Sequence, residues 1–189
     1  MKKIIIFIFT VSLFAAGCRT SRQVTQSKPA TIQPSAEAEQ YLKYADQTTW
    51  LLGYFKREQM YHSPHCEWYL SGYDNYKPDS VAVSKLKEMG TGNINIKVVM
   101  GTWCPDSRRE VPRLLHILDM WNFPGDNVTF IGVDESKQSP VGEYQSLGIQ
   151  RVPTFIFYKN NVETGRIIEN PSTSLEQDMV NILARNEKQ

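Results

Sequence analysis

The stretch INIKVVMGTWCPDS, residues 94–107, decides the fold of this chain. Its first seven residues predict a buried strand, and the unbroken apolar end Val98–Met100 is typical of a central parallel strand covered on both faces. A helical pattern follows from Ser107 to about Trp121, with Pro112 inside it, where a proline kinks a helix. The sequence therefore predicts a strand that leads through a short turn into a helix, with Cys104 in the turn.

Cys104 is placed for thiol chemistry. The start of a helix carries partial positive charge and unpaired N–H groups, which favour a thiolate over a thiol. Arg108, Arg109 and Arg151 lie close enough in the predicted arrangement to favour the thiolate further, whereas Asp106 opposes them. The alternative is an inert cysteine in a scaffold that has kept the fold and lost the activity.

Ser107 stands where a second thiol would complete a Cys-x-x-Cys redox pair. Its hydroxyl can cap the helix or donate a hydrogen bond to the Cys104 sulfur, but it cannot attack a disulfide. We therefore expect a mixed disulfide on Cys104 to be released by an external thiol. Cys66 is a possible resolving thiol if its loop folds over Cys104; otherwise it is a buried core cysteine.

The remaining segments predict one α/β domain, in which a mixed sheet is flanked by helices. Residues 36–60 have apolar residues near helical spacing, and residues 61–78 predict an irregular connector. The expected helices are Val81–Met89, Val141–Leu147 and a last one from Leu175; the expected further strands are Asn127–Val133, Thr154–Tyr158 and Glu163–Glu169. This gives a helical extension at 36–89 and a core at 90–187.

This order of elements resembles the thioredoxin fold, and three local features support the likeness. Trp103-Cys104-x-x-Ser107 occupies the place of the family's Trp-Cys-x-x-Cys, and Pro112 lies where thioredoxins carry a kinking proline. Val152-Pro153-Thr154 looks like the family's cis-proline loop, which lies opposite the catalytic sulfur. The likeness covers about residues 90–187. Upstream, Trp50-Leu51-Leu52-Gly53-Tyr54, Glu67-Trp68-Tyr69 and the run 73–79, together with 101–107, resemble a group of exported bacterial thioredoxin-like proteins.

The resemblance implies roles for particular residues. It assigns catalysis to Cys104 and Ser107, with support from Trp103, Pro105, Asp106, Arg151, Val152 and Pro153. The residue before Pro153 would offer its backbone to an extended substrate strand; the alternative for Pro153 is a rigid turn. Ser107 replaces the resolving cysteine, and Val98 replaces the buried acid that many thioredoxins hold five positions before the tryptophan. These two departures remove the ordinary dithiol reductase cycle.

The N-terminus resembles a bacterial lipoprotein signal. Lys2 and Lys3 precede an apolar run at 4–16, and Ala15-Ala16-Gly17 stands before Cys18. We expect cleavage before Cys18, lipid on its sulfur and a flexible tether at 18–35, ahead of a domain at 36–189. The alternative is a plain secretory signal. Either way the domain is exported, to the bacterial cell envelope in the lipoprotein case, where disulfides persist.

Composition excludes some classes of function. The 189 residues carry a formal charge of +1, which becomes −1 when residues 1–17 take Lys2 and Lys3 with them, so nothing favours nucleic acid. His62, His65 and Cys66 have ligand-like spacing without a second ligand pair, so we expect no metal and no cofactor. We expect a monomer with cysteine-containing envelope proteins and an external thiol reductant as partners. The sequence predicts a lipid-anchored monothiol oxidoreductase; the alternative is a non-catalytic peptide-binding module of the same fold.

Overall fold

The structure is a computed structural model and describes residues 44–187. They contain a five-stranded sheet of order β1-β3-β2-β4-β5. The strands are β1 (Gly53–Phe55), β2 (Ile94–Met100), β3 (Val128–Gly132), β4 (Thr154–Lys159) and β5 (Val162–Ile168). Strand β2 is central and runs parallel to β3, whereas the other neighbouring pairs are antiparallel. The predicted mixed sheet is confirmed; the predicted signal sequence, Cys18 and tether lie outside the described residues.

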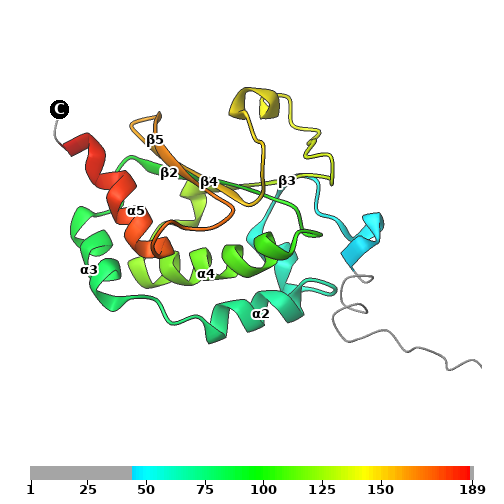
Figure 1. Cartoon of the computed structure of the whole chain (residues 1–189), viewed down its shortest axis with the longest axis horizontal. Helices are drawn as coiled ribbons and strands as arrows, with labels where there is room; N and C mark the ends of the chain where they lie inside the picture. Colours follow the sequence, from blue (N-terminus) through cyan, green and yellow to red (C-terminus); the bar gives the residue numbers. More distant parts are fainter. Residues whose placement is uncertain (1–43, 188–189) are drawn as a thin grey trace, which may run out of the picture. The chain divides into compact units, whose positions relative to one another are not determined.

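In the part of the chain that the structure describes, the helices α2 (Cys66–Asn75), α3 (Ser80–Met89), α4 (Pro105–Trp121) and α5 (Leu175–Leu183) accompany the sheet. Short 3-10 turns lie at η1 (Gln47–Thr49), η2 (Arg57–Tyr61), η3 (Gly125–Asn127), η4 (Tyr144–Leu147) and η5 (Ala184–Glu187). Figure 1 shows α4 and α5 along one face of the sheet, with α2 on the side of α4 away from it. Within residues 44–187, none of the helices is long and apolar enough to cross a membrane.

The central strand β2 supplies both hydrophobic cores, because side chains of a strand alternate between the two faces of its sheet. Ile96, Val98 and Met100 belong to the larger core, which they share with α4 and α5. Val99 points to the opposite face and belongs to a smaller core with Cys104. The unbroken apolar end of the strand therefore reflects burial on both faces, as predicted.

The helical prediction for residues 36–60 is wrong where the structure describes them as η1, β1 and η2. Strand β1 pairs with β3 at the edge of the sheet, with Gly53 opposite Gly132. The Leu51 carbonyl passes so close to Gly132 that a Cβ there would lie 1.8 Å from its oxygen. Phe55 packs on Phe130 with ring centroids 5.4 Å apart. Long-range pairing thus decides the backbone here, against the local spacing of apolar residues.

The connector predicted for residues 61–78 is also wrong in part, because it contains helix α2. The helix buries Trp68 and Tyr69 and lies against α4 at Gly72, where a Cβ would come within 2.8 Å of Pro112. Packing of this kind, more than local propensity, stabilises short helices. The predicted helix at Val141–Leu147 is only the 3-10 turn η4.

Candidate active site

Cys104 lies between the end of β2 and the start of α4. It is the N-cap residue of α4 with an extended backbone, and Pro105 is the first helical residue. Its N–H donates to the Gly101 carbonyl at 2.9 Å, and its side chain is 6% exposed. The sulfur therefore lies at the positive end of a 17-residue helix and is almost closed off from solvent.

The loop before β4 faces the Cys104 sulfur. The Val152–Pro153 peptide bond is cis, as the resemblance implied. The Cys104 thiol donates a hydrogen bond to the Val152 carbonyl, with Sγ and the oxygen 3.3 Å apart. A carbonyl accepts from a thiol but not from a thiolate, so this contact favours the neutral form of the sulfur.

Ser107 does not have the predicted N-cap role, because Cys104 itself occupies the N-cap position. Ser107 is the third residue of α4 and is fully buried. Its Oγ accepts a hydrogen bond from the Gly101 N–H at 3.3 Å, which ties the end of β2 to the first turn of the helix. The serine hydroxyl thus fixes the turn that carries Cys104.

Trp103 is held in place above the same turn. Its Nε1–H donates to the Val133 carbonyl at 2.9 Å. A Cβ at Gly101 would lie 2.5 Å from the indole, so only glycine fits beneath the ring. Trp103 and Pro105 also line a hollow of about 450 Å³ with Glu135 and Lys137.

Two of the three arginines predicted to favour the thiolate have carboxylate partners. Arg109 forms ion pairs with Asp106 at 2.7 Å and Glu110 at 2.6 Å. Arg151, whose side chain is 66% exposed, pairs with Glu169 at 2.8 Å. Their positive charges are therefore compensated locally.

The third arginine, Arg108, has a different environment. Its Nη1 donates to the carbonyls of Thr102 at 3.2 Å and Trp103 at 2.6 Å. Its guanidinium lies 4.2 Å from the centre of the Tyr44 ring. Burial lowers the pKa of this guanidinium, and interactions with Tyr44 and Cys104 act in the opposite direction.

A segment that sequence reasoning did not assign to the site covers the turn from the other side. Leu51 donates its N–H to the Thr102 hydroxyl at 3.3 Å, and the Trp50 ring lies 6.3 Å from the Trp103 ring. Trp50 also donates its Nε1–H to the Tyr44 carbonyl at 2.9 Å. The sequence signalled this segment only through Trp50-Leu51-Leu52, which formed part of the upstream resemblance.

Cys66 begins helix α2, is half-buried and, like Cys104, is a free cysteine. The preceding His65 is buried, and its Nδ1 has no hydrogen-bond partner. Burial, reinforced by the charge of Arg108, lowers the His65 pKa against an opposing hydrogen bond with the Thr49 backbone. The loop before α2 therefore lies near Arg108, and a resolving role for Cys66 stays a prediction. In residues 44–187, no three His, Cys, Asp or Glu side chains are grouped to hold a metal.

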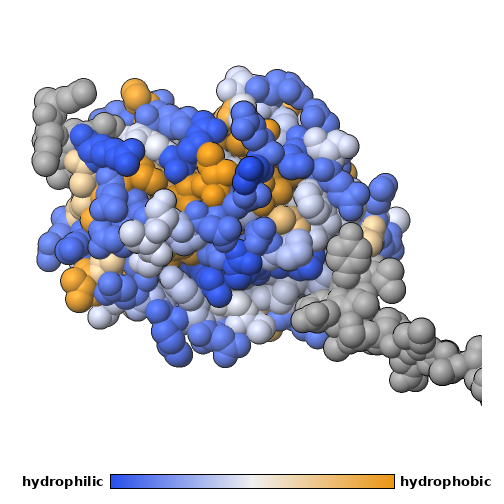
Figure 2. All heavy atoms as spheres, viewed as in Figure 1, coloured by the Kyte–Doolittle hydropathy of each residue, from blue (hydrophilic) through white to orange (hydrophobic). Residues whose placement is uncertain are grey.

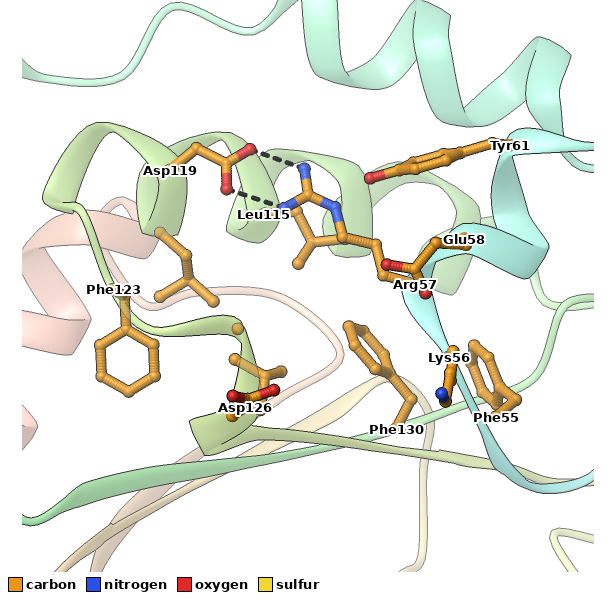
Figure 3. A pocket seen from close by; sticks show the side chains of 13 residues that line it. Phe55, Lys56, Arg57, Glu58, Tyr61, Leu115, Asp119, Phe123, Asp126 and Phe130 are labelled. Carbon is orange, nitrogen blue, oxygen red and sulfur yellow. Dashed lines mark hydrogen bonds and ion pairs between the residues drawn. The ribbon is translucent and has the colours of Figure 1, made fainter.

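A larger hollow of about 590 Å³ lies at the other end of α4 and contains no cysteine. Figure 3 shows Arg57 and Asp119 facing each other at its edge, above the rings of Phe123 and Phe130. Asp119 accepts two hydrogen bonds from Arg57, at 2.7 and 2.6 Å, and one from the Tyr73 hydroxyl at 2.6 Å. These charges compensate each other, so the thiol end of α4 remains the candidate site.

Comparison with known proteins identifies the family of this chain. A family model described as thioredoxin matches residues 58–183. The thioredoxin of Malassezia sympodialis is 30% identical over 101 residues, which span 52% of this chain and 82% of that protein. Among solved structures, a Pseudomonas aeruginosa protein of unknown function is 16% identical with a TM-score of 0.43, over 63% of this chain and 79% of that one. Fasciola hepatica thioredoxin is 20% identical with a TM-score of 0.35, over 55% and 89%.

Proposed function

Because this chain belongs to the thioredoxin family, we propose that it is a membrane-anchored thiol–disulfide oxidoreductase that works outside the cytoplasm through Cys104 alone. Family membership supports thiol–disulfide exchange as the chemistry. The proposed substrates are disulfides or oxidised cysteines of envelope proteins. An external thiol resets the protein after each turnover.

The observation that carries the proposal is the position of Cys104 at the start of α4, across from the cis Val152–Pro153 bond. The helix N-terminus favours the thiolate, which is the attacking form of a cysteine. Ser107 occupies the second position of the motif and cannot attack a mixed disulfide. One thiol therefore starts the reaction, and the second thiol comes from outside the motif.

The surroundings of Val152 support binding of an extended chain next to the sulfur. Its carbonyl, which accepts from the Cys104 thiol in the free protein, is a ready acceptor for the N–H of an incoming strand. Figure 2 shows apolar atoms gathered over β4 and the segment that leads into it, framed by hydrophilic side chains. Such an area suits the side chains of a bound peptide.

The first test uses a peptide whose cysteine carries thionitrobenzoate as a mixed disulfide. The Cys104 thiolate attacks the peptide sulfur, a new Cys104–peptide disulfide forms, and coloured thionitrobenzoate leaves with the electron pair of the broken bond. Added glutathione then attacks the Cys104–peptide disulfide and releases one of the two sulfurs as a thiolate. We expect the full chain to form the adduct and to lose it on addition of glutathione.

Matched variants locate the reacting thiol. Cys104→Ser should abolish the adduct, whereas Ser107→Ala should retain it, because the serine takes no part in bond breaking. Cys66→Ser should also retain it and should leave glutathione as the agent of release. An adduct that resolves without added thiol in the unchanged chain, but not in Cys66→Ser, would instead make Cys66 the resolving thiol.

A non-catalytic peptide-binding module is the second candidate, favoured by the 6% exposure of Cys104 and its bond to Val152. The same fold would then bind envelope proteins without exchanging sulfur. A Cys104→Ala chain that keeps all partner binding and all function in the cell supports this candidate and contradicts the first.

Anchoring is tested separately through Cys18. We expect the full chain in the membrane fraction and in the detergent-rich phase, carrying radioactive palmitate after labelling. Cys18→Ser should lose the label and the membrane association, and Cys66→Ser should keep both. A soluble unchanged chain would remove the anchor from the proposal and leave the exchange chemistry untouched.

A further inference from the structure

We infer that Arg108 is the residue that positions and electrostatically supports the Cys104 thiolate, whereas Arg109 and Arg151 have no such role. This inference rests on the proposed function and deepens it, because it names the cation on which the single thiol depends. Arg108 acts through the backbone that carries Cys104 and through its charge, and it contacts no substrate.

The hydrogen bonds of Arg108 place its charge beside the turn. One terminal nitrogen, Nη1, donates to both carbonyls that directly precede Cys104, those of Thr102 and Trp103. Both acceptors are uncharged, so they hold the guanidinium without cancelling its charge. The same bonds fix the end of the turn from which the Cys104 backbone continues into the helix.

The guanidinium of Arg108 also lies over the Tyr44 ring, with its central carbon 4.2 Å from the ring centre. An aromatic face attracts a cation and also displaces water from it. Water would screen the interaction with a sulfur, so a partly desolvated cation acts more strongly at a given distance. The electrostatic interaction between Arg108 and Cys104 is one of the few that act on this arginine.

Among residues 44–187, no carboxylate forms an ion pair with Arg108. The neighbouring Arg109 makes a sharp contrast, because it pairs with both Asp106 and Glu110. Arg151 is paired with Glu169 at the exposed surface. The three arginines therefore differ in whether a positive charge is left over for the thiolate.

Other charged and titratable groups also surround the turn. They come from each element packed near it: Asp106 and Arg109 from α4, His65 from the loop before α2, Tyr44 from the N-terminal segment, Glu135 and Lys137 from the loop after β3, and Arg151 from the loop before β4. Burial keeps His65 neutral near pH 7 by lowering its pKa. Asp106 is compensated by Arg109. The Val152 carbonyl favours the thiol, so Arg108 and the helix N-terminus are the groups that oppose it.

The test is the pH dependence of Cys104 alkylation in the full chain, read by mass spectrometry of the peptide that contains Cys104. Iodoacetamide reacts with the thiolate, so the midpoint of the rate profile reports the thiol pKa, and the plateau reports access to the sulfur. For Arg108→Gln we expect the midpoint to move up by about one pH unit, since an opposite charge has been removed. Arg108→Met should do the same.

The matched controls are Arg151→Gln and the double variant Arg109→Gln/Asp106→Asn, which removes an ion pair as a whole and leaves no unpaired carboxylate beside the thiol; both should leave the midpoint where it is. If Arg108 only held the turn, its replacement would raise the plateau through better access and leave the midpoint unchanged; that outcome overturns the inference. A shift of equal size in either control variant overturns it too.

If the neutral variants do not fold, Arg108→Lys against Arg109→Lys decides the question. Lysine keeps the charge but cannot reproduce the planar fork. We expect a smaller upward shift for Arg108→Lys and none for Arg109→Lys, and equal midpoints in the two contradict the inference. Alkylation needs no disulfide partner, so it tests Arg108 even where the peptide exchange fails.

Discussion

The charged side chains at the two ends of helix α4 have different kinds of partner. At the C-terminal end, Asp119 and Arg57 form a bidentate ion pair, and Tyr73 donates to the same carboxylate. At the N-terminal end, Arg108 is held by two neutral carbonyls beside Cys104. Within residues 44–187, one helix thus has an end at which the charges pair and an end at which the cation has no carboxylate partner.

The C-terminal end of α4 joins parts of the fold, whereas the N-terminal end carries the candidate reactive groups. The compensated end joins η2, α2 and α4, and His116 completes it by stacking on Tyr73 at 4.6 Å. The larger hollow lies there, yet no cysteine lines it. The N-terminal end has a smaller hollow and leaves one thiol and one cation available. Among the described residues, the candidate site therefore coincides with a cation that has no carboxylate partner, and not with the larger hollow.

The largest expected effect comes from restoring the missing thiol with Ser107→Cys. The buried position 107 lies one helical turn from Cys104, the spacing of the family's redox pair. Under diamide as oxidant, both thiols should lose their protons and join as an intramolecular disulfide, which the unchanged chain cannot form between these positions. Mass spectrometry of the oxidised peptide gives the answer, and a reduced pair in excess diamide would mean that the turn holds the two positions apart.

A second test acts midway between the two ends, where α2 crosses α4 at Gly72. Gly72→Ala places a Cβ within 2.8 Å of Pro112, and we expect a loss of about 2 kcal/mol in the free energy of unfolding, as for other overpacked sites. Urea denaturation measures it. Adding Pro112→Ala should return part of the loss, and strictly additive effects in this double-mutant cycle would show that the two positions do not clash.

A third test breaks the compensated end alone. Asp119→Asn leaves the half-buried Arg57 without its carboxylate, and we expect a loss of about 1 kcal/mol, kept small because both side chains are partly exposed. The midpoint of the Cys104 alkylation profile should stay unchanged. A shifted midpoint would mean that the two ends of α4 are coupled and that the contrast between them fails.

The smallest expected effect is the pH dependence of the stability that the Arg57–Asp119 pair contributes. Burial alone would raise the Asp119 pKa, but hydrogen bonds from Arg57 and Tyr73 outweigh burial and hold it below its usual range. The pair therefore stabilises the fold above the pKa of a free aspartate, about 3.9, and this stability is lost as the pH falls through the lower folded value. The difference in the free energy of unfolding between the unchanged chain and Asp119→Asn should narrow as the pH falls below the free aspartate value of about 3.9. If this difference in the free energy of unfolding persists in acid, the stabilisation by Asp119 is not ionic.

Much of the core could be predicted because its signals are local. The run Val98–Met100 signals a strand buried on both faces, and Pro112 and Val152-Pro153 sit at spacings typical of the family. Strands β2 and β4 and helix α4 accordingly match their predictions closely. Cys104 was identified in the same way, as the residue between a strand and a helix.

The predictions that are wrong concern segments whose structure depends on residues far away in the sequence. Strand β1 exists because Gly53 pairs with Gly132, and α2 is a helix because Gly72 meets Pro112. The three arginines look alike in sequence, and Arg151 differs from Arg108 in its exposure and in its pairing with Glu169, 18 residues further along the chain. Ser107 does not cap helix α4 as expected, because Cys104, three residues earlier, holds the N-cap position with its extended backbone.

The pairing of Gly53 with Gly132 also has a kinetic consequence. It closes a loop of 79 residues, and such distant contacts are entropically costly and form late in folding. The same edge delivers Leu51 and Trp50 to the turn that holds Cys104. We expect this edge to open before the rest of the domain, with the fastest amide exchange of the sheet. The segment that covers the turn would then be the least persistent part of the sheet edge, so the turn that carries Cys104 becomes accessible from that side without global unfolding.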